Sequence, residues 1–351
     1  MPLGEFELID RFFREAGCRR GDVVLGVGDD GAILRPPEGF DLIAVSDTLV
    51  EGVHFPAGAP ARSVGHRALA VNLSDIAAMG AVPAWSLLAL TLPRADEAWL
   101  KEFAEGFSIL ALEHEVELVG GDTTRGPLMI GVQVIGFVPH GVGLRRAGGR
   151  PGDLICVSGT PGDAAAGLAL LASGRAPEVA LDTAAGATSR RARGDASSRV
   201  ALLARFEYPA PRLELGRQLR DIATACIDVS DGLAGDIGKL ATASGCAAII
   251  DLERLPRSSA LAALVREGVF EEREALRFML AGGDDYELAF TVPPENREAL
   301  AELEARGEVS VIGALVEAEP GAPHVTVRTE QPELQRYLDA LPSSFDHFVH
   351  G

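Results

Sequence analysis

Apolar residues in this chain fall into two kinds of run: short blocks typical of strands, and longer stretches with helical spacing. The two kinds alternate through most of the sequence, which predicts an α/β or α+β fold whose helices cover sheets. We expect strands at 41–46, 85–92, 128–138, 153–158, 224–229, 247–252, 286–292 and 309–316.

Two stretches have clear helical patterns. In 96–115 the side chains of Trp99, Phe103 and Leu110 share one face. The second, 161–173, follows Thr160, opens with a proline and stops before a glycine, as helices often do. We expect both apolar stripes to pack into the core.

A segment rich in Gly, Arg and Pro at 139–152 separates two blocks of strands and helices. We expect two domains, 1–140 and 150–351, a number that also suits a length of 351 residues. The strings at 72–75 and 228–231 resemble each other faintly, by internal duplication or by chance. The stretch 174–200 combines small residues with arginines and reads as a surface insertion.

Composition narrows the possible partners. The chain is 47% apolar, enough for a sizeable core, and its net charge is −19. Such a surface argues against sequence-independent binding to nucleic acid or to an anionic membrane. An anionic ligand would have to arrive with cations or meet a local basic site.

The four cysteines, at 18, 156, 226 and 246, form no C-x-x-C pair, so no zinc knuckle or redox dithiol is visible. Cys156 and Cys226 lie in apolar runs and are expected to be buried thiols. The first residues lack a signal-peptide pattern, and no apolar run approaches the ~20 residues of a membrane helix. We expect a cytoplasmic location.

Acidic residues beside Gly or Ser recur along the chain, at 28–30, 46–47, 74–75, 120–122, 228–231 and 282–285. Any one of them is most simply a turn or a helix cap. Taken together they predict several hard cations that hold a polyanion, because so many carboxylates cannot share a cleft without counter-ions. Asp47 and Asp122 follow apolar runs and Asp228 lies within one, so the three are candidates for the carboxyl edge of a sheet.

Familiar nucleotide motifs are missing. The sequence contains no Walker A loop and no kinase V-A-I-K or H-R-D, and the G-x-G at 26–28 is followed by two aspartates. If the protein transfers phosphoryl groups, metals held by carboxylates must neutralise and position the transferred group.

Seven strings together resemble the thiamine-monophosphate kinase family, within the superfamily of aminoimidazole ribonucleotide synthetase. They keep the order and spacing of that family over nearly the whole chain. The strings are GVGDDGAIL (26–34), SDTLVEGVHF (46–55), NLSDIAAMGA (72–81), GGDTTRG (120–126), IDVSDGL (227–233), GGDDYEL (282–288) and FDHF (345–348).

The resemblance implies a two-domain aminoimidazole ribonucleotide synthetase-like fold and a homodimer whose N-terminal sheets pair into a barrel. It implies magnesium-dependent transfer of the ATP γ-phosphoryl group directly onto thiamine monophosphate, with several Mg²⁺ ions. No catalytic nucleophile from the protein is expected.

The resemblance also implies roles for individual residues. The nucleotide would be contacted by Gly121, Asp122, Arg146 and Ser230. The thiamine side would be lined by His54, Asp284 and Phe345. The metals would be bound by Asp30, Ser46, Asp47, Asp75, Asp122, Asp228 and Asp231, with Ser46 acting through its hydroxyl or its carbonyl.

Two positions depart from the family pattern. Val45 stands where Ser or Thr is common, and Asp284 stands where Glu is usual, which shortens a side chain expected to contact the substrate. Two alternatives stay open: another ATP-dependent synthetase of the superfamily that acts through a phosphorylated intermediate, and a nucleotide-binding regulator without catalysis.

Overall fold

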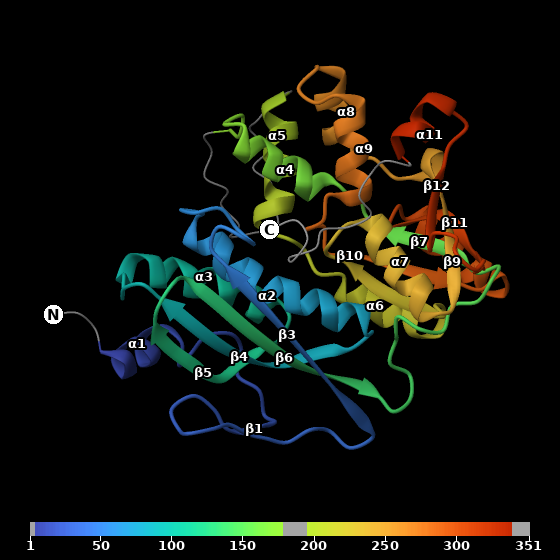
Figure 1. Ribbon diagram of the computed structural model, residues 1–351. Helices are drawn as coiled ribbons and strands as arrows, with labels where there is room; N and C mark the ends of the chain where they lie inside the picture. The colour runs from blue at the N-terminus through green and yellow to red at the C-terminus, as the bar shows by residue number, and fades with distance from the viewer. Residues whose placement is uncertain (1–3, 178–194, 339–351) are drawn as a thin grey trace. The chain divides into compact units, whose positions relative to one another are not determined.

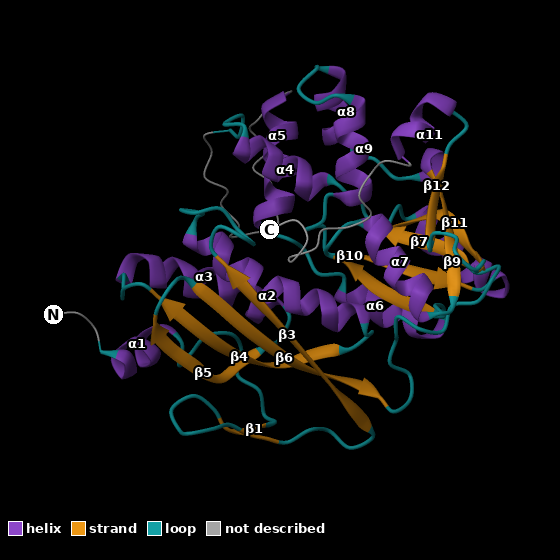
Figure 2. Cartoon of the chain, viewed as in Figure 1, coloured by secondary structure: helices purple, strands orange, loops and turns teal. Residues whose placement is uncertain are grey.

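One large sheet organises each of the two units, Met1–Gly143 and Leu144–Gly351. The computed structural model describes residues 4–177 and 195–338 (Figures 1 and 2). The candidate residue Phe345 and most of the predicted insertion at 174–200 lie outside the described residues.

The first unit contains a four-stranded sheet in the order β3-β6-β4-β5, in which only the β4–β5 pair is parallel. The strands β1 and β2 pair with each other as a separate two-stranded antiparallel sheet. The strands are β1 (Val23–Leu25), β2 (Ile33–Leu34), β3 (Phe40–Val50), β4 (Val82–Leu92), β5 (Glu117–Arg125) and β6 (Met129–Pro139).

The two long helices of this unit cover one face of the sheet, which we call the inner face (Figure 1). Nearly every position of α2 is buried, so its apolar residues surround the helix instead of forming a stripe. In α3, Asp96 caps the first turn by accepting the N–H groups of Ala98 and Trp99. The helices are α1 (Glu5–Phe12), α2 (Ala61–Ala78) and α3 (Glu97–Glu113).

The opposite, outer face is covered only in part. Trp85 and Phe137 project from it and pack with residues of the β1–β2 segment, and Trp85 Nε1 donates to Asp22 at 3.0 Å. On the edge strand β3, Leu42 pairs with Phe137 and is still 51% exposed.

The second unit contains a six-stranded sheet in the order β12-β9-β11-β7-β10-β8, in which only the β12–β9 pair is parallel. Residues of β7, β8, β9, β10 and β11 form one core with α7, which packs on the sheet. The strands are β7 (Leu154–Ser158), β8 (Ala225–Val229), β9 (Cys246–Asp251), β10 (Glu287–Val292), β11 (Val309–Glu317) and β12 (Val325–Arg328).

Helices α4, α5, α8 and α9 of this unit pack together around a second apolar core, visible as a cluster in Figure 2. The α-helices are α4 (Asp163–Ala172), α5 (Asp195–Glu207), α6 (Leu213–Gln218), α7 (Leu233–Ala243), α8 (Ser259–Arg266), α9 (Glu272–Ala281), α10 (Arg297–Ala305) and α11 (Pro332–Leu338). Short 3₁₀ turns are η1 (Leu219–Asp221), η2 (Leu252–Arg254) and η3 (Pro294–Asn296).

The predicted mixture of helices and sheets is confirmed, and each of the eight predicted strands overlaps an observed one. Both predicted helices are present as α3 and α4, and Cys156 and Cys226 are buried as expected. The faint echo between 72–75 and 228–231 has no structural counterpart, because the first lies inside α2 and the second leaves β8 for a turn. Among the described helices, none has the length and apolar character needed to span a membrane.

Candidate functional site

Asp47 of β3 and Asp75 of α2 lie where these two elements run side by side. The N–H of Asp47 donates to Oδ1 of Asn72 at 3.1 Å, and the fully buried Asn72 is anchored by its own donation to the carbonyl of Ala68. Asp75 lies one helical turn beyond Asn72 and therefore on the same face of α2. These two candidate metal ligands, both half-buried, thus belong to one neighbourhood.

Asp122 lies on the other side of the same sheet. Pairing aligns Asp47 with Val132, Leu88 and Gly121 in one row across the four strands, and Thr48 with Gly131, Ala89 and Asp122 in the next. Paired residues share a face and successive rows alternate, so Asp47 is on the inner face and Asp122 on the outer. Three strand spacings separate the two strands, about 14 Å.

The expectation that Asp47 and Asp122 follow their strands is wrong. Both lie inside strands, because β3 continues to Val50 and β5 to Arg125. Gly121 shows why β5 tolerates its irregular course: its φ is +150°, and a Cβ there would lie 1.8 Å from the carbonyl oxygen of Leu88. Alternation also places the hydroxyl of Ser46 on the face opposite the carboxylate of Asp47.

Asp30 is exposed in the connection between β1 and β2. Its N–H donates to Oδ1 of Asp29 at 2.8 Å. The guanidinium of Arg14 lies beside this loop, since a Cβ on Gly28 would approach it to 3.4 Å. Sequence reasoning did not select Arg14, which lies in the turn just after α1 and belongs to no motif.

His54 occupies a tight turn after β3. Its N–H donates to the carbonyl of Val50, and its ring Nδ1 accepts the N–H of Val50 at 3.0 Å. An Nδ1 that accepts a hydrogen bond carries no proton in the neutral ring, so the proton is on Nε2.

In the second unit, β8 ends at Asp228-Val229 and leads through Ser230 and Asp231 into α7. The N–H groups of Ser230 and Asp231 both donate to Oδ2 of Asp236 at 3.0 Å. Asp236 is 1% exposed, and burial raises its pKa while Lys239 opposes that shift. Lys239 also forms an ion pair with Asp231.

Asp284 is brought directly to this turn. Its N–H donates to the carbonyl of Ser230 at 2.9 Å, which joins a candidate substrate residue to a candidate nucleotide residue. Sequence reasoning missed Asp236 and Lys239, and the acidic residue in the first turn of a helix was the available clue to Asp236.

Arg146 is attached to the other end of α7. Ser244, the residue after this helix, donates through Oγ to the carbonyl of Arg146 at 3.2 Å and accepts the N–H of Gly149 at 3.1 Å. The helix has 11 residues, so its length of about 16 Å separates the Arg146 loop from the Ser230 turn.

The candidate ligands therefore form small sets within each unit. No cluster of three or more His, Cys, Asp or Glu suited to a metal occurs within 4–177 and 195–338. Pairs of aspartates nevertheless suit Mg²⁺, which usually takes one or two carboxylates and completes its shell with water and substrate phosphates. The oxygen-only donor set of Asp47 and Asp75 fits that ion.

Family models match both halves of the chain. Residues 28–138 match the AIR synthase related protein N-terminal domain, and residues 150–325 match the C-terminal domain of the same family. The predicted superfamily fold is thereby confirmed.

Individual relatives are also similar over most of their length. The thiamine-monophosphate kinase of Escherichia coli K12 is 48% identical over 300 residues, 86% of each chain. The crystal structure of thiamine-monophosphate kinase from Stenotrophomonas maltophilia K279a is 42% identical, with a TM-score of 0.78 over 94% of this chain and 98% of that one. The structure of AaThiL complexed with AMPPCP and TMP is 29% identical, with a TM-score of 0.72 over 92% of each chain.

Proposed function

We propose, because this chain belongs to the thiamine-monophosphate kinase family, that it transfers the γ-phosphoryl group of ATP to thiamine monophosphate and so forms thiamine diphosphate. The observation that carries the proposal is the similarity to AaThiL, whose structure is described as a complex with AMPPCP and TMP. We take these ligands to stand for the nucleotide and the acceptor.

The domain at 1–140 would bind metal and nucleotide and form the dimer. The second domain, at 150–351, would be an α/β domain. On the first, Asp30, Asp47, Asp75 and Asp122 would hold magnesium, with Ser46 joining Asp47 through its carbonyl because its hydroxyl points to the other face. Bound Mg²⁺ would neutralise the charge of the transferred group.

On the second unit, Asp228 and Asp231 would also bind magnesium. Ser230 would contact the nucleotide from the turn that Asp236 fixes, and Arg146 would grip a phosphate from the loop that Ser244 fixes. Gly121 and Asp122 of the first unit would also face the nucleotide.

The acceptor would be bound by His54, Asp284 and Phe345. The Nε2 proton of His54 is suited to a phosphate oxygen, because Nδ1 is already engaged with Val50. No protein nucleophile is needed for in-line transfer, which depends on positioning and charge stabilisation.

We also propose a homodimer in which the N-terminal sheets pair into a barrel. The open part of the outer face supports this, since Leu42 is 51% and Met129 42% exposed there. The same face carries Asp122, so pairing of two sheets would bury it beside a second chain. The four free thiols suit a reducing cytoplasm.

The comparisons do not favour the alternatives of a synthetase with a phosphorylated intermediate or a regulator without catalysis. The test is an assay of the purified chain with ATP, Mg²⁺ and thiamine monophosphate. We expect ADP and thiamine diphosphate in a one-to-one ratio. ADP release that does not depend on thiamine monophosphate would refute the assignment.

A further inference from the structure

The loop between α9 and β10 has an uncommon backbone. Asp284 and Tyr286 both adopt left-handed conformations, with φ of 62° and 51°. Aspartate tolerates this region, but a bulky tyrosine is rare there. Such a conformation is energetically unfavourable and persists only where the surrounding structure imposes it.

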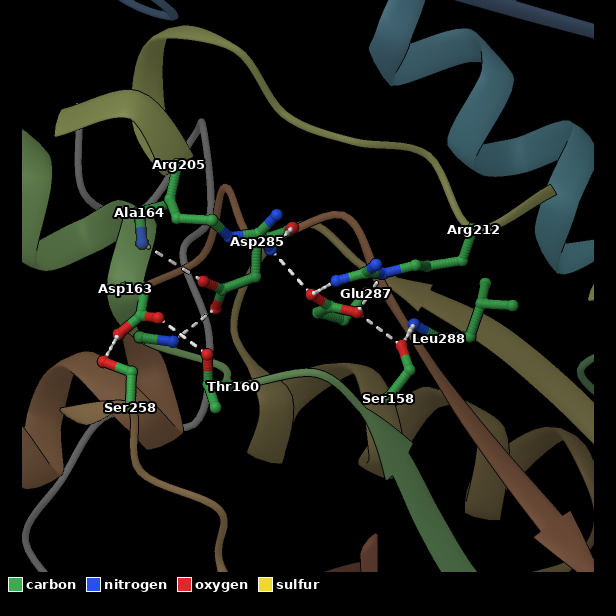
Figure 3. A network of polar contacts seen from close by, with 11 residues as sticks. Ser158, Thr160, Asp163, Ala164, Arg205, Arg212, Ser258, Asp285, Glu287 and Leu288 are labelled. Carbon is green, nitrogen blue, oxygen red and sulfur yellow. Dashed lines mark hydrogen bonds and ion pairs between the residues drawn. The ribbon is translucent and has the colours of Figure 1, made fainter. Parts of the chain in front are cut away.

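The residue between these two supplies the constraint. Asp285 is 1% exposed, and its carboxylate accepts the N–H of Gly162 at 2.8 Å and that of Ala164 at 3.4 Å, at the start of α4 (Figure 3). Arg205 donates to its carbonyl at 3.2 Å. The side chain thus ties the middle of the loop to α4, and the carbonyl ties it to α5.

The next acid along the chain fixes the exit of the loop. Glu287 is fully buried and accepts hydrogen bonds from Arg205, Arg212 and the hydroxyl of Ser158 (Figure 3). Burial alone would raise the pKa of Glu287, but the two guanidinium groups hold it below the ordinary value. These contacts anchor the start of β10 to α5, to Arg212 and to β7.

With both anchors in place, the loop lies against the Ser230 turn. The N–H of Asp284 reaches the carbonyl of Ser230 at 2.9 Å, and that of Tyr286 reaches Val229 at 2.8 Å. The approach is close enough that a Cβ on Gly283 would lie 2.6 Å from the oxygen of Ser230. The hydroxyl of Tyr286 also donates to the carboxylate of Asp284 at 3.1 Å.

The Ser230 turn, which is the candidate nucleotide contact, is also held by Asp236. Asp236 holds the N–H groups of Ser230 and Asp231 and does not contact the 282–286 loop through these bonds. We therefore expect a disturbance of Asp285 to move Asp284, while Asp236 continues to hold the N–H groups of Ser230 and Asp231.

We infer that Asp285 is a positioning residue for the phosphate acceptor, which holds the 282–286 loop so that the carboxylate of Asp284 is presented beside Ser230. The inference rests on the proposed function, in which Asp284 contacts thiamine monophosphate. Asp285 itself is buried, so it would act through the position of Asp284.

The test is Asp285→Asn, because the amide keeps the shape and one acceptor but turns an N–H donor toward a backbone N–H. We expect the KM for thiamine monophosphate to rise about tenfold, with the KM for ATP unchanged. The matched control is Asp163→Asn, because Asp163 is a buried acid at the start of α4 that accepts from Thr160 and Ser258 at 2.6 Å. It should lower thermal stability without changing either KM.

Tyr286→Phe provides a milder variant that removes only the hydroxyl, and it should raise the acceptor KM about threefold. Calorimetry measures the affinity of the wild type and of each variant for thiamine monophosphate directly, without the need for turnover. The inference is overturned if Asp285→Asn and Tyr286→Phe bind thiamine monophosphate as the wild type does. It is also overturned if the KM values for ATP and for thiamine monophosphate rise equally. In either case, turnover by the wild-type chain still supports the proposed function. A wild-type chain that neither binds nor phosphorylates thiamine monophosphate refutes both.

Discussion

Asp47 and Asp122 lie on opposite faces of one four-stranded sheet, on strands at its two edges. The strands β6 and β4 intervene, so the two carboxylates of one chain are too far apart to bind the same ion. Suppose that Asp47 and Asp122 both bind metal ions that hold ATP. Then either each carboxylate binds a different ion, or a second chain supplies the other carboxylate of a shared site.

The proposed dimer makes this distinction testable. We expect Asp47→Asn and Asp122→Asn each to abolish turnover with the fold intact, because each removes a charged metal ligand. If each site combines Asp47 of one chain with Asp122 of the partner, mixed and re-equilibrated variants should regain about a quarter of wild-type activity, since half the dimers carry one intact site. Circular dichroism of each variant checks the fold. If the mixture stays inactive, a site shared between two chains is contradicted. Asp47 and Asp122 then act within one chain or in separate sites.

Ser244 should tune nucleotide affinity. Ser244→Ala removes the hydroxyl that fixes both Arg146 and Gly149, so the KM for ATP should rise roughly threefold to tenfold while the KM for thiamine monophosphate stays constant. Thr242→Ala is the control, because the hydroxyl of Thr242 donates to the carbonyl of Gly238 within α7. Equal effects from the two substitutions would show that α7 stability, and not the Arg146 loop, is responsible.

Glu287 should be important for stability. Glu287→Ala leaves Arg205 and Arg212 without their buried partner, which is expected to lower the free energy of unfolding by about 3–5 kcal/mol. Urea unfolding measures the loss. Glu214→Ala, which removes an exposed ion pair with Arg217, should change it by less than about 1 kcal/mol. Similar midpoints for the two variants would contradict the role assigned to the buried network.

Glu207 should make stability depend on pH. Burial raises the pKa of Glu207 to about 7 from an ordinary 4.5. The folded state therefore binds the proton of Glu207 more tightly than the unfolded state does. The stability that protonated Glu207 contributes is fully present below pH 4.5 and is lost as the pH rises through 7. Glu207→Gln should match wild type at pH 4.5 and exceed it at pH 8 by roughly 3 kcal/mol. Parallel pH profiles for the two proteins would contradict the raised pKa.

Local sequence patterns predicted most of the strands because their apolar blocks are compact and bounded by Gly, Pro or charge. The helix α2 was harder to recognise, since it is buried on nearly all sides and shows no polar stripe. Motifs identified the family through short strings such as VEGVHF and NLSDIAAMG, whose residues are local in sequence.

The arrangement of the candidate site was less predictable because it depends on pairing between distant segments. The faces occupied by Asp47 and Asp122 follow from the register of three strand pairs, which no local pattern fixes. Asp285 looks like an ordinary turn acid beside Asp284 in the sequence. Only the fold shows that it is buried against the start of α4.

The most direct test of the central claim follows the phosphoryl group itself. Purified protein is incubated with Mg²⁺, thiamine monophosphate and ATP whose non-bridging γ-oxygens are ¹⁸O, and the product is examined by mass spectrometry. Transfer of the γ-phosphoryl group predicts thiamine diphosphate that carries all three labelled oxygens on its terminal phosphate, together with unlabelled ADP. Thiamine diphosphate without the label, or none while ATP is consumed, would contradict the account.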